Sequence, residues 1–314
     1  MKVLIVGAGS VGQVYGRHFQ LGGADVAFLV KEKHAEEARR GFTLYALKES
    51  GRTPLRFEGF EVLTALDGRK WDAILLAVSS PAIRGAWLDE LARRSGDATI
   101  VMLQPGLTDH AHVAERVGQG RLVSGLIGFM AYSAPLPGEK VPEPGTAYWF
   151  PPLAPCPFSG PPERVAPVVE TLARGGFPAK AHRDVQGELA FKGAVFETYV
   201  LALECAGWRF AELRRDRELV RLGARAAREV ASLAEKVQGR KAPAALMLAG
   251  PLGVRMGMRV VSHLAPFDLE TFFKVHFTKV AEQTREMFET YASLAARHGV
   301  ATPALEALRQ RIAS

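Results

Sequence analysis

The chain of 314 residues has the composition of a globular protein, with 48% hydrophobic and 23% charged residues, and its length favours two domains over one. Its formal net charge is +7, but basic and acidic residues alternate almost everywhere. The most basic segment, Arg209 to Arg228, lacks the interleaved aromatic residues of a nucleic-acid-binding surface. We interpret this segment as a solvated helix face and expect no nucleic-acid partner.

Cysteine content and hydropathy indicate the cellular compartment in which the protein is expected. The two cysteines, Cys156 and Cys205, are far apart and lack the spacing of a zinc site or a disulfide framework. The apolar run from Val3 to Val6 is too short for a signal peptide, and no run of about eighteen uncharged apolar residues occurs elsewhere. We expect a cytoplasmic protein with no metal site and no membrane partner.

The first predicted elements are a strand over Val3 to Val6 and a helix over Gly12 to Leu21, followed by a strand over Asp25 to Val30. A G-x-G-x-x-G pattern joins the first strand to the helix, which is the setting in which such glycines hold a dinucleotide. The residues expected to hold its pyrophosphate are Gly7, Ala8, Gly9, Ser10, Val11 and Gly12. The alternative is a glycine turn without a ligand.

The end of the second strand indicates which dinucleotide is bound. NAD sites place a carboxylate there for the ribose 2′-hydroxyl, but this strand ends in Val30 and continues with Lys31. A basic side chain can pair with a 2′-phosphate, so the sequence favours NADP. The alternatives are that Lys31 and Lys33 only solubilise a loop, or that Glu32 accepts a hydroxyl.

The remaining elements predict an α/β protein with a doubly wound, Rossmann-type sheet over residues 1–182 and an all-helical domain over residues 183–314. In the first part we expect strands Trp71 to Val78, Ala98 to Leu103 and Leu122 to Phe129, a helix Ala82 to Arg94 and a hairpin at Tyr148 to Phe150. In the second part we expect helices Val185 to Ala206, Ala211 to Gln238 and Leu269 to His298.

Three stretches carry a resemblance to a known family: MKVLIVGAGSVGQVYGRHFQLGGADVAFLVK, Gln104-Pro105-Gly106, and ELAFKGA with Lys192. Together they resemble the ketopantoate reductase family, within the larger 6-phosphogluconate-dehydrogenase-like group. The resemblance implies NADPH-dependent reduction of a 2-oxo acid, as in pantothenate biosynthesis. It also implies that Val78 and Gln104 lie at the cofactor and that Lys192 is catalytic. Long apolar helices are compatible with a homodimer.

The position of Lys192 has a physical interest of its own. On one helix, Leu189, Lys192, Phe196 and Tyr199 share a stripe, so a cation lies on an otherwise apolar face. An ammonium group near a carbonyl that accepts hydride stabilises the developing negative charge and can donate the proton. The alternative is an ion pair between Lys192 and Glu188, one helical turn earlier.

The chain departs from the family where the substrate is recognised. Phe196 and Val200 stand where the family has asparagines, Pro105 replaces a third asparagine, and Ser79 replaces a lysine. These apolar residues leave the polar groups of ketopantoate without partners, at about 1–3 kcal/mol for each buried group. We therefore predict an altered pocket and a larger, more apolar substrate.

A polar stripe is expected on the predicted helix Leu269 to His298. Its members are His276, Lys279, Gln283, Glu286 and Thr290, opposite a buried side of Phe272, Phe273, Phe277 and Val280. In this arrangement His276 would be a proton donor, Lys279 would hold a substrate carboxylate, and Gln283 would occupy the place of the family's catalytic glutamate. The alternative is a solvated face. An opine-type or other 2-hydroxy-acid dehydrogenase, or a non-catalytic NADP-binding protein, also remains open.

Overall fold

The computed structural model describes residues 1–48, 51–152, 154–242, 259 and 263–313. Of Glu188, Leu189, Ala190, Ala194, Glu282, Gln283 and Ala313 it describes the backbone alone. The chain divides into two compact units, Met1–Gln186 and Gly187–Ser314. The division falls within helix α6 (Val185–Cys205), shortly after the predicted domain boundary.

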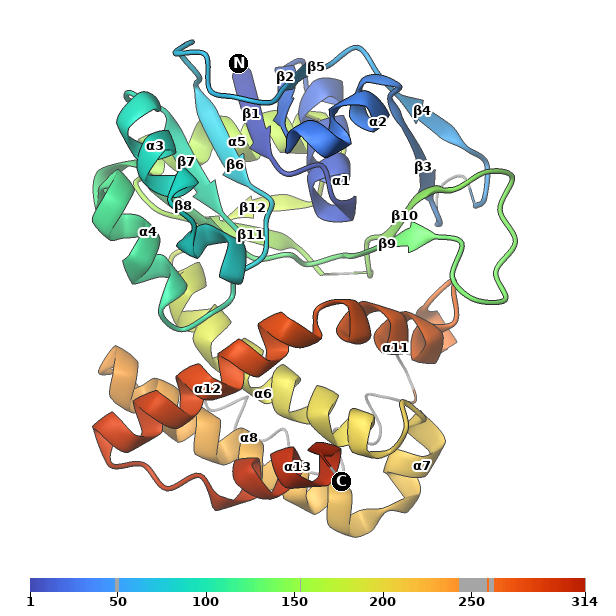
Figure 1. Cartoon of the computed structure of the whole chain (residues 1–314), viewed down its shortest axis with the longest axis vertical. Coiled ribbons are helices and arrows are strands. Elements are labelled where there is room, and N and C mark those ends of the chain that lie inside the picture. The colour runs from blue at the N-terminus through green and yellow to red at the C-terminus, as the bar shows by residue number, and fades with distance from the viewer. Residues whose placement is uncertain (49–50, 153, 243–258, 260–262, 314) are drawn as a thin grey trace. The chain divides into compact units, whose positions relative to one another are not determined.

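The amino-terminal unit is built on an eight-stranded sheet in the order β12-β11-β8-β7-β6-β1-β2-β5 (Figure 1). Its strands are β1 (Lys2–Val6), β2 (Asp25–Leu29), β5 (Glu61–Leu63), β6 (Ala73–Leu76), β7 (Thr99–Met102), β8 (Leu122–Gly125), β11 (Cys156–Ser159) and β12 (Ala179–Ala181). Neighbouring strands are parallel except β8 and β11. The predicted α/β fold class is confirmed.

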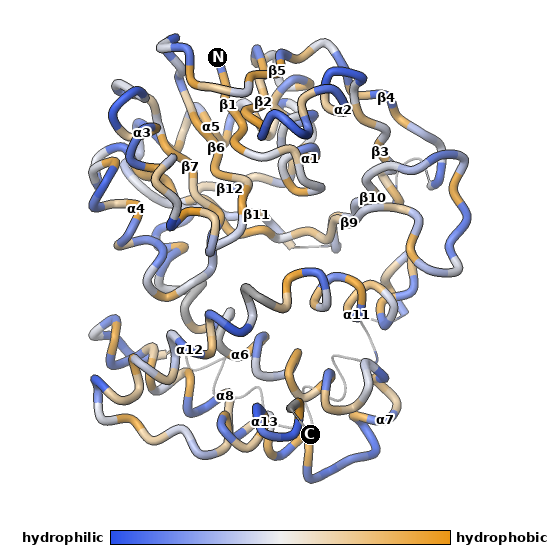
Figure 2. The backbone as a smooth tube through the Cα atoms, viewed as in Figure 1, coloured by the Kyte–Doolittle hydropathy of each residue, from blue (hydrophilic) through white to orange (hydrophobic). Residues whose placement is uncertain are grey.

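The strands are apolar throughout because both faces of the sheet are covered. In β1, Val3 and Ile5 enter one core and Leu4 and Val6 enter the other. The first core is closed by α1 (Ser10–Leu21) and α5 (Pro162–Arg174), and the second by α3 (Trp87–Arg94) and α4 (Asp109–Val117). Hydrophobic residues follow the strands of this sheet, whereas the outer helices carry many hydrophilic ones (Figure 2).

A second sheet of four strands, in the order β4-β3-β10-β9, packs beside α1. Its strands are β3 (Phe42–Ala46), β4 (Leu55–Phe57), β9 (Met130–Ala134) and β10 (Gly145–Trp149). The hairpin expected at Tyr148 to Phe150 is confirmed in kind but not in its bounds, because β10, which ends at Trp149, pairs antiparallel with the preceding strand β9 on one side and runs parallel to β3 on the other. The partner on that second side lies about a hundred residues earlier in the chain.

The remaining short elements of this unit are helical: η1 (Glu32–His34), α2 (Ala35–Arg39), η2 (Pro81–Arg84) and η3 (Gln119–Arg121). The helix predicted over Ala82 to Arg94 is interrupted, since η2 ends at Arg84 and α3 begins at Trp87. Gly85 is extended there, with φ −72° and ψ 151°, and separates the two elements.

Helices α1 and α5 cross with their backbones in contact at the carboxyl-terminal ends. A Cβ added to Gly22 would lie 2.0 Å from the carbonyl oxygen of Thr171, and one added to Gly175 would lie 1.9 Å from that of His18. At the same crossing the Nδ1–H of His18 donates to the carbonyl of Gly175 over 2.7 Å. Burial lowers the pKa of His18 from 6.5 to about 4. The crossing therefore fixes one end of α1.

The carboxyl-terminal unit is helical in its described part. It contains most of α6, then α7 (Phe210–Arg215), α8 (Arg217–Gln238), α11 (Leu269–Lys279), α12 (Ala281–His298) and α13 (Pro303–Ala313). Helix α8 packs against α12 and α13, and the Glu229 carboxylate accepts the backbone N–H groups of Ala304 and Leu305 at the start of α13. No described helix has the combined length and hydropathy to cross a membrane.

Two long helices predicted for this unit are wrong in their continuity. The segment Ala211 to Gln238 is broken at Asp216, whose carboxylate accepts the N–H of Leu219 at 2.8 Å and begins a new helix, α8. The segment Leu269 to His298 is broken at Val280, with φ −103° and ψ 21°, so that α11 ends and α12 begins. The prediction for α6 is confirmed to within one residue.

Candidate cofactor and active site

The glycine-rich loop leaves β1 at the point where the chain order of the sheet reverses, between β1 and β6. In doubly wound sheets ligands bind at the carboxyl ends of the strands at this point. Gly7 has φ +99°, which glycine adopts readily, and its N–H donates to Leu29 over 3.0 Å. A Cβ on Gly7 would lie 2.8 Å from the carbonyl oxygen of Ala77, and one on Gly12 would lie 2.3 Å from that of Gly7. Both glycines are therefore required by packing within the protein.

Gly9 differs from the other two glycines. It precedes α1 with φ −70° and ψ 175°, and no side chain caps this end of the helix. A Cβ added to Gly9 would have no protein atom within 4 Å. The loop is thus open at Gly9, beside the unpaired N–H groups and positive dipole end of α1, and it can receive an anion there. Ala8, Ser10 and Val11 complete the loop and the first turn, and each is half-buried.

The side chain of Gln13, which was not among the sequence predictions, stabilises this loop through hydrogen bonds. Gln13 donates from Nε2 to the carbonyl of Ala8 over 2.9 Å and accepts at Oε1 from the hydroxyl of Thr146 over 2.7 Å. Thr146 lies on β10 and is 4% exposed. The glycine loop is therefore tied to the small sheet. The sequence signal for Gln13 was its place directly after Gly12; nothing in the sequence signalled Thr146.

The loops that follow β6 and β7 lie at the same carboxyl-terminal edge of the sheet as the glycine loop. Gln104 donates from Nε2 to the carbonyls of Leu76 at 2.8 Å and Val78 at 2.7 Å, and its Oε1 accepts the N–H of Leu103 at 3.1 Å. With 3% of its surface exposed, Gln104 uses its amide to fix the end of β6. Val78 is half-buried, and its Cγ1 would lie 3.0 Å from a Cβ on Gly7. The predicted cofactor residues Val78 and Gln104 thus adjoin the glycine loop.

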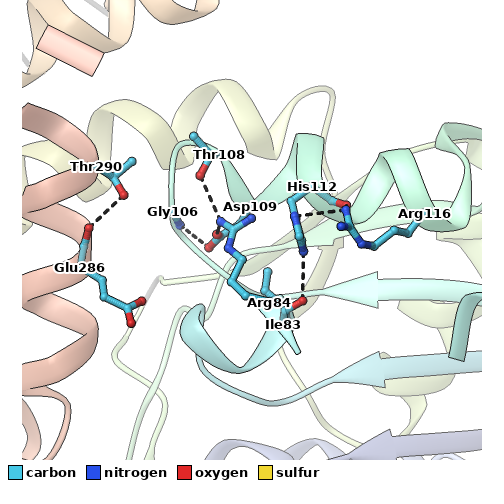
Figure 3. Close-up of polar contacts among 9 residues, drawn as sticks. All are labelled: Ile83, Arg84, Gly106, Thr108, Asp109, His112, Arg116, Glu286 and Thr290. Carbon is cyan, nitrogen blue, oxygen red and sulfur yellow. Dashed lines mark hydrogen bonds and ion pairs between the residues drawn. The ribbon is translucent and has the colours of Figure 1, made fainter. Parts of the chain in front are cut away.

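A carboxylate network that was also not predicted holds the next loop (Figure 3). Asp109 is 1% exposed and accepts the N–H of Gly106 at 2.9 Å. Arg84 donates to the Asp109 carboxylate at 2.5 Å and to the Thr108 hydroxyl at 3.0 Å. A Cβ on Gly106 would lie 2.5 Å from the carboxylate, so this network explains the glycine. It joins the loops after β6 and β7 into one support.

The residues at the end of β2 are those on which the choice of dinucleotide was based. Val30 is 7% exposed and its N–H donates to Leu63 over 2.9 Å, so the strand offers no side-chain acceptor there. Lys31 is exposed. The guanidinium of Arg69 is engaged by the carboxylates of Glu61 and Asp67, at 2.8 Å and 2.6 Å. Lys31 remains the first candidate for a phosphate partner.

In the helical unit, α6 presents Lys192 at an exposed position, with Phe196 one turn later. Phe196 is 50% exposed, whereas Val200 is 4% exposed. Of the predicted stripe on α6, the side chain of Leu189 lies outside the described residues. The ring of Phe196 lies 6.2 Å from that of Phe273 and 6.1 Å from that of Phe277 on α11.

The polar stripe predicted along one helix is wrong as a continuous feature, because the break at Val280 separates its members. His276 and Lys279 lie on α11, whereas Glu286 and Thr290 lie on α12. The Thr290 hydroxyl donates to the carbonyl of Glu286 over 2.9 Å (Figure 3). The side chain of Gln283 lies outside the described residues.

The environment of α11 combines rings and cations. Lys279 is exposed, and the pKa of His276 is lowered mainly by burial and further by the charge of Lys279. On the side predicted to be buried, Phe272 and Phe273 are 6% and 8% exposed. Phe277 and Val280 are only half-buried, which corrects that part of the prediction.

Comparison with known proteins relates part of the amino-terminal unit to a family. Residues 3–147 match the family model of ketopantoate reductase PanE/ApbA. No curated protein sequence matches the chain.

Solved structures with the same fold include D-mandelate dehydrogenase in a ternary structure with NADH and anilino(oxo)acetate. Its TM-score is 0.74 at 14% identity, with 100% of this chain and 97% of that chain covered. The 2-dehydropantoate 2-reductase from Methylococcus capsulatus has a TM-score of 0.72 at 16% identity, with 98% and 94% covered. A PanE/ApbA family ketopantoate reductase from Ralstonia eutropha JMP134 has a TM-score of 0.74 at 17% identity, with 100% and 97% covered.

These identities show a shared fold, while the family model matches the glycine loop and the strands around it. The family resemblance drawn from the sequence motifs is thereby confirmed. Residues 3–147 of this chain are thus similar to the ketopantoate reductase family.

Proposed function

We propose that this protein is a nicotinamide-dinucleotide-dependent reductase of a 2-oxo acid. The observation that carries the proposal is the open backbone at Gly9. A Cβ there would meet no protein atom within 4 Å, whereas the positions of Gly7 and Gly12 are filled by neighbouring backbone. The uncapped start of α1 and this open space fit a pyrophosphate, so the residues present are compatible with the cofactor.

When bound, a reduced nicotinamide supplies the hydride. The glycine loop would hold the pyrophosphate, with Gln13 and Gln104 fixing the backbone on either side. We assign to Lys192 the stabilisation of the negative charge that develops on the carbonyl oxygen of the oxo acid, and the donation of a proton to it. The resemblance to the family supports this role, together with the exposure of Lys192 on α6.

His276 fits a different role from the proton donor expected from the sequence. Because its pKa is lowered below the ordinary value of 6.5, its imidazole is neutral at neutral pH and can accept a hydrogen bond or a proton. Lys279, whose charge helps to lower that pKa, is the candidate for holding the substrate carboxylate. In this proposal Lys192 supplies the proton and Lys279 supplies the second cation.

We propose NADPH as the preferred hydride donor, because Lys31 follows β2 where an NAD site has a carboxylate. Dissociation constants for NADPH and NADH test this preference. Replacing Lys31 by Ala should weaken NADPH binding by about ten- to a hundredfold and leave NADH binding unchanged, because a charge-assisted hydrogen bond to phosphate contributes about 1.5–3 kcal/mol. Lys70→Ala is the matched control, since Lys70 is exposed and precedes β6, at the opposite edge of the parallel sheet. A wild-type preference for NADH would refute NADP.

Turnover is tested by following NADPH consumption with a panel of 2-oxo acids. Replacing Lys192 by Ala should lower kcat by about a hundredfold or more with NADPH affinity unchanged. Lys274→Ala, which removes another exposed lysine of the helical unit, should behave as wild type. Near-normal turnover of Lys192→Ala would exclude the assigned role. NADPH binding without turnover of any oxo acid would indicate a non-catalytic dinucleotide-binding protein.

The lowered pKa of His276 favours one second candidate, a 2-hydroxy-acid dehydrogenase of opine or other type in which His276 is the base for oxidation. In that case oxidation of a 2-hydroxy acid should lose its acidic limb in the pH profile when His276 is replaced by Ala, while Lys192→Ala retains it. An unchanged profile would exclude this candidate.

A further inference from the structure

The exposure of Phe196 is unusual for its helix. The side chain is 50% exposed, although Phe191, five residues earlier, is 1% exposed and Val200, one turn later, is 4% exposed. A single exposed apolar residue is ordinary in a globular protein. Phe196, however, lies one helical turn after Lys192 and contacts further rings. Its surroundings therefore indicate whether its exposure has a functional role.

Those surroundings are aromatic and ordered. Phe196 lies against Phe273 and Phe277, whose rings are stacked with centroids 5.8 Å apart and an interplanar angle of 8°. The ring of Trp208 is also nearly parallel to that of Phe277, with centroids 6.1 Å apart and an interplanar angle of 9°. We call Phe196, Trp208 and Phe277 the ring platform. Trp208 and Phe277 are each half-buried, so the platform is open to a ligand on part of its surface.

The backbone of Trp208 is held in a conformation that tryptophan rarely adopts. Its φ is 64°, in the left-handed region, and it is the one non-glycine residue with positive φ in the described part of the chain. Its N–H donates to the carbonyl of Leu203 over 2.9 Å, which retains this turn after α6. Such conformations are unfavourable for a non-glycine residue and gather at functional sites. This observation is independent of the exposure of Phe196 and shows that the turn at the end of α6 holds the backbone of Trp208 in place.

Two lysines lie within one helical turn of members of the ring platform. The His276 ring lies edge to face against Phe277, with centroids 5.0 Å apart, and the charge of Lys279 acts on His276. Lys192 lies one turn before Phe196 on α6. Rings bordered by two ammonium groups complement a molecule with an aromatic ring at one end and a carboxylate at the other.

We infer that the substrate is an aryl 2-oxo acid whose ring stacks on the ring platform. This inference rests on the proposed function and names its substrate class. The rings offer no hydrogen-bonding partner to a hydroxylated aliphatic side chain, and they leave a small side chain without contacts. An aryl group fills the surface with offset or edge contacts instead.

Two measurements test the inference, one with and one without turnover. The first compares kcat/KM for phenylglyoxylate and pyruvate with NADPH in wild type, Phe196→Ala and Phe196→Leu. We expect wild type to prefer phenylglyoxylate, and Phe196→Ala to lower kcat/KM for it by about tenfold or more while changing that for pyruvate little. Phe196→Leu should recover only part of the loss. Leu264→Ala is the matched control, because Leu264 is also an exposed apolar residue of this unit, at 54%.

The second measurement titrates phenylglyoxylate into the protein and follows tryptophan fluorescence, to which Trp208 contributes from within the ring platform. A saturable change is expected in wild type and in Leu264→Ala, weakened about tenfold in Phe196→Ala and lost in Trp208→Phe.

The outcomes separate the inference from the proposed function. Absence of a saturable response in wild type, or equal affinity in wild type and Phe196→Ala, overturns the inference whatever the turnover shows. Binding of phenylglyoxylate without NADPH oxidation supports the ring platform while the proposed reductase activity fails. Efficient reduction of pyruvate and no preference for phenylglyoxylate would support the reductase and refute the inferred substrate class.

Discussion

Replacing Gly9 by Ala should affect cofactor binding without affecting the stability of the fold. Gly9 has φ −70° and ψ 175°, which any residue adopts, and the added methyl group would meet no protein atom within 4 Å. A Gly→Ala change at such a position stabilises by about 0.4–1 kcal/mol through the unfolded state, and alanine is a poorer helix cap than glycine by a similar amount. We therefore expect the free energy of unfolding to change by less than about 1 kcal/mol.

The same methyl group would occupy the space that we assign to the pyrophosphate. We expect the dissociation constant for NADPH to rise at least a hundredfold, which corresponds to about 2.7 kcal/mol. Gly12→Ala provides the contrast, because its Cβ would lie 2.3 Å from the carbonyl oxygen of Gly7, so that the loop itself must shift. That variant should lose about 1–3 kcal/mol of stability as well as affinity.

Titration of NADPH fluorescence and denaturant unfolding of both variants supply the two quantities. Wild-type affinity in Gly9→Ala would show that no phosphate approaches this backbone, and the argument for the cofactor site would be refuted. Equal destabilisation of Gly9→Ala and Gly12→Ala would show that the open space is filled in solution.

The remaining predictions concern Gln13 and His18. Gln13→Leu removes the hydrogen bonds to Ala8 and Thr146 and should raise the NADPH dissociation constant about tenfold with kcat retained. The control Thr43→Val, which removes a hydroxyl bond to Glu143 from a strand of the same small sheet, should lower only stability. Equal NADPH affinity in Gln13→Leu and wild type would contradict this role of Gln13. Since the pKa of His18 falls from 6.5 to about 4 on folding, the unfolded chain binds a proton that the folded chain excludes, and the free energy of unfolding should fall by about 3 kcal/mol as the pH is lowered through that interval. Urea unfolding over the interval should show a smaller fall in His18→Phe, and parallel pH dependence of the two proteins would refute the assignment.

The parts of the fold that depend on local pattern were predictable from the sequence. A β-branched run, three glycines and a helix follow one another within the first 21 residues, and each requires only its neighbours to form. The end of β2 at Val30 and Lys31 could be read for charge in the same way. These features carried both the fold class and the family.

Features that depend on distant partners were not predictable. Strand β10 exists because β3 and β9 flank it, and Thr146 meets Gln13 across 133 positions of the sequence. The helix breaks at Asp216 and Val280 interrupt segments whose apolar periodicity continues through them. For Asp216 the carboxylate is a visible capping signal, whereas no residue at Val280 announces the end of α11.

The candidate site shows the same division. The glycines and Lys31 were predicted from residue type and position, and Lys192 mainly from the family resemblance. The buried Asp109, which holds Gly106, was not found, because an acidic residue at a helix start is ordinary until its neighbour Arg84 is known. The assignment of Gln104 to the cofactor stays a prediction, and its amide bonds to the carbonyls of Leu76 and Val78 could not be foreseen from the sequence.

The crossing of α1 and α5 has a consequence for cofactor engineering. Helix α1 contains 12 residues and is therefore about 18 Å long, with the glycine loop at one end and the crossing at the other. Because the backbones at Gly22 and Gly175 leave no room for a side chain, this end of α1 is held rigidly against α5. A side chain at Gly175 would collide with the carbonyl oxygen of His18 on α1, so libraries designed to change nucleotide preference should keep that remote glycine constant.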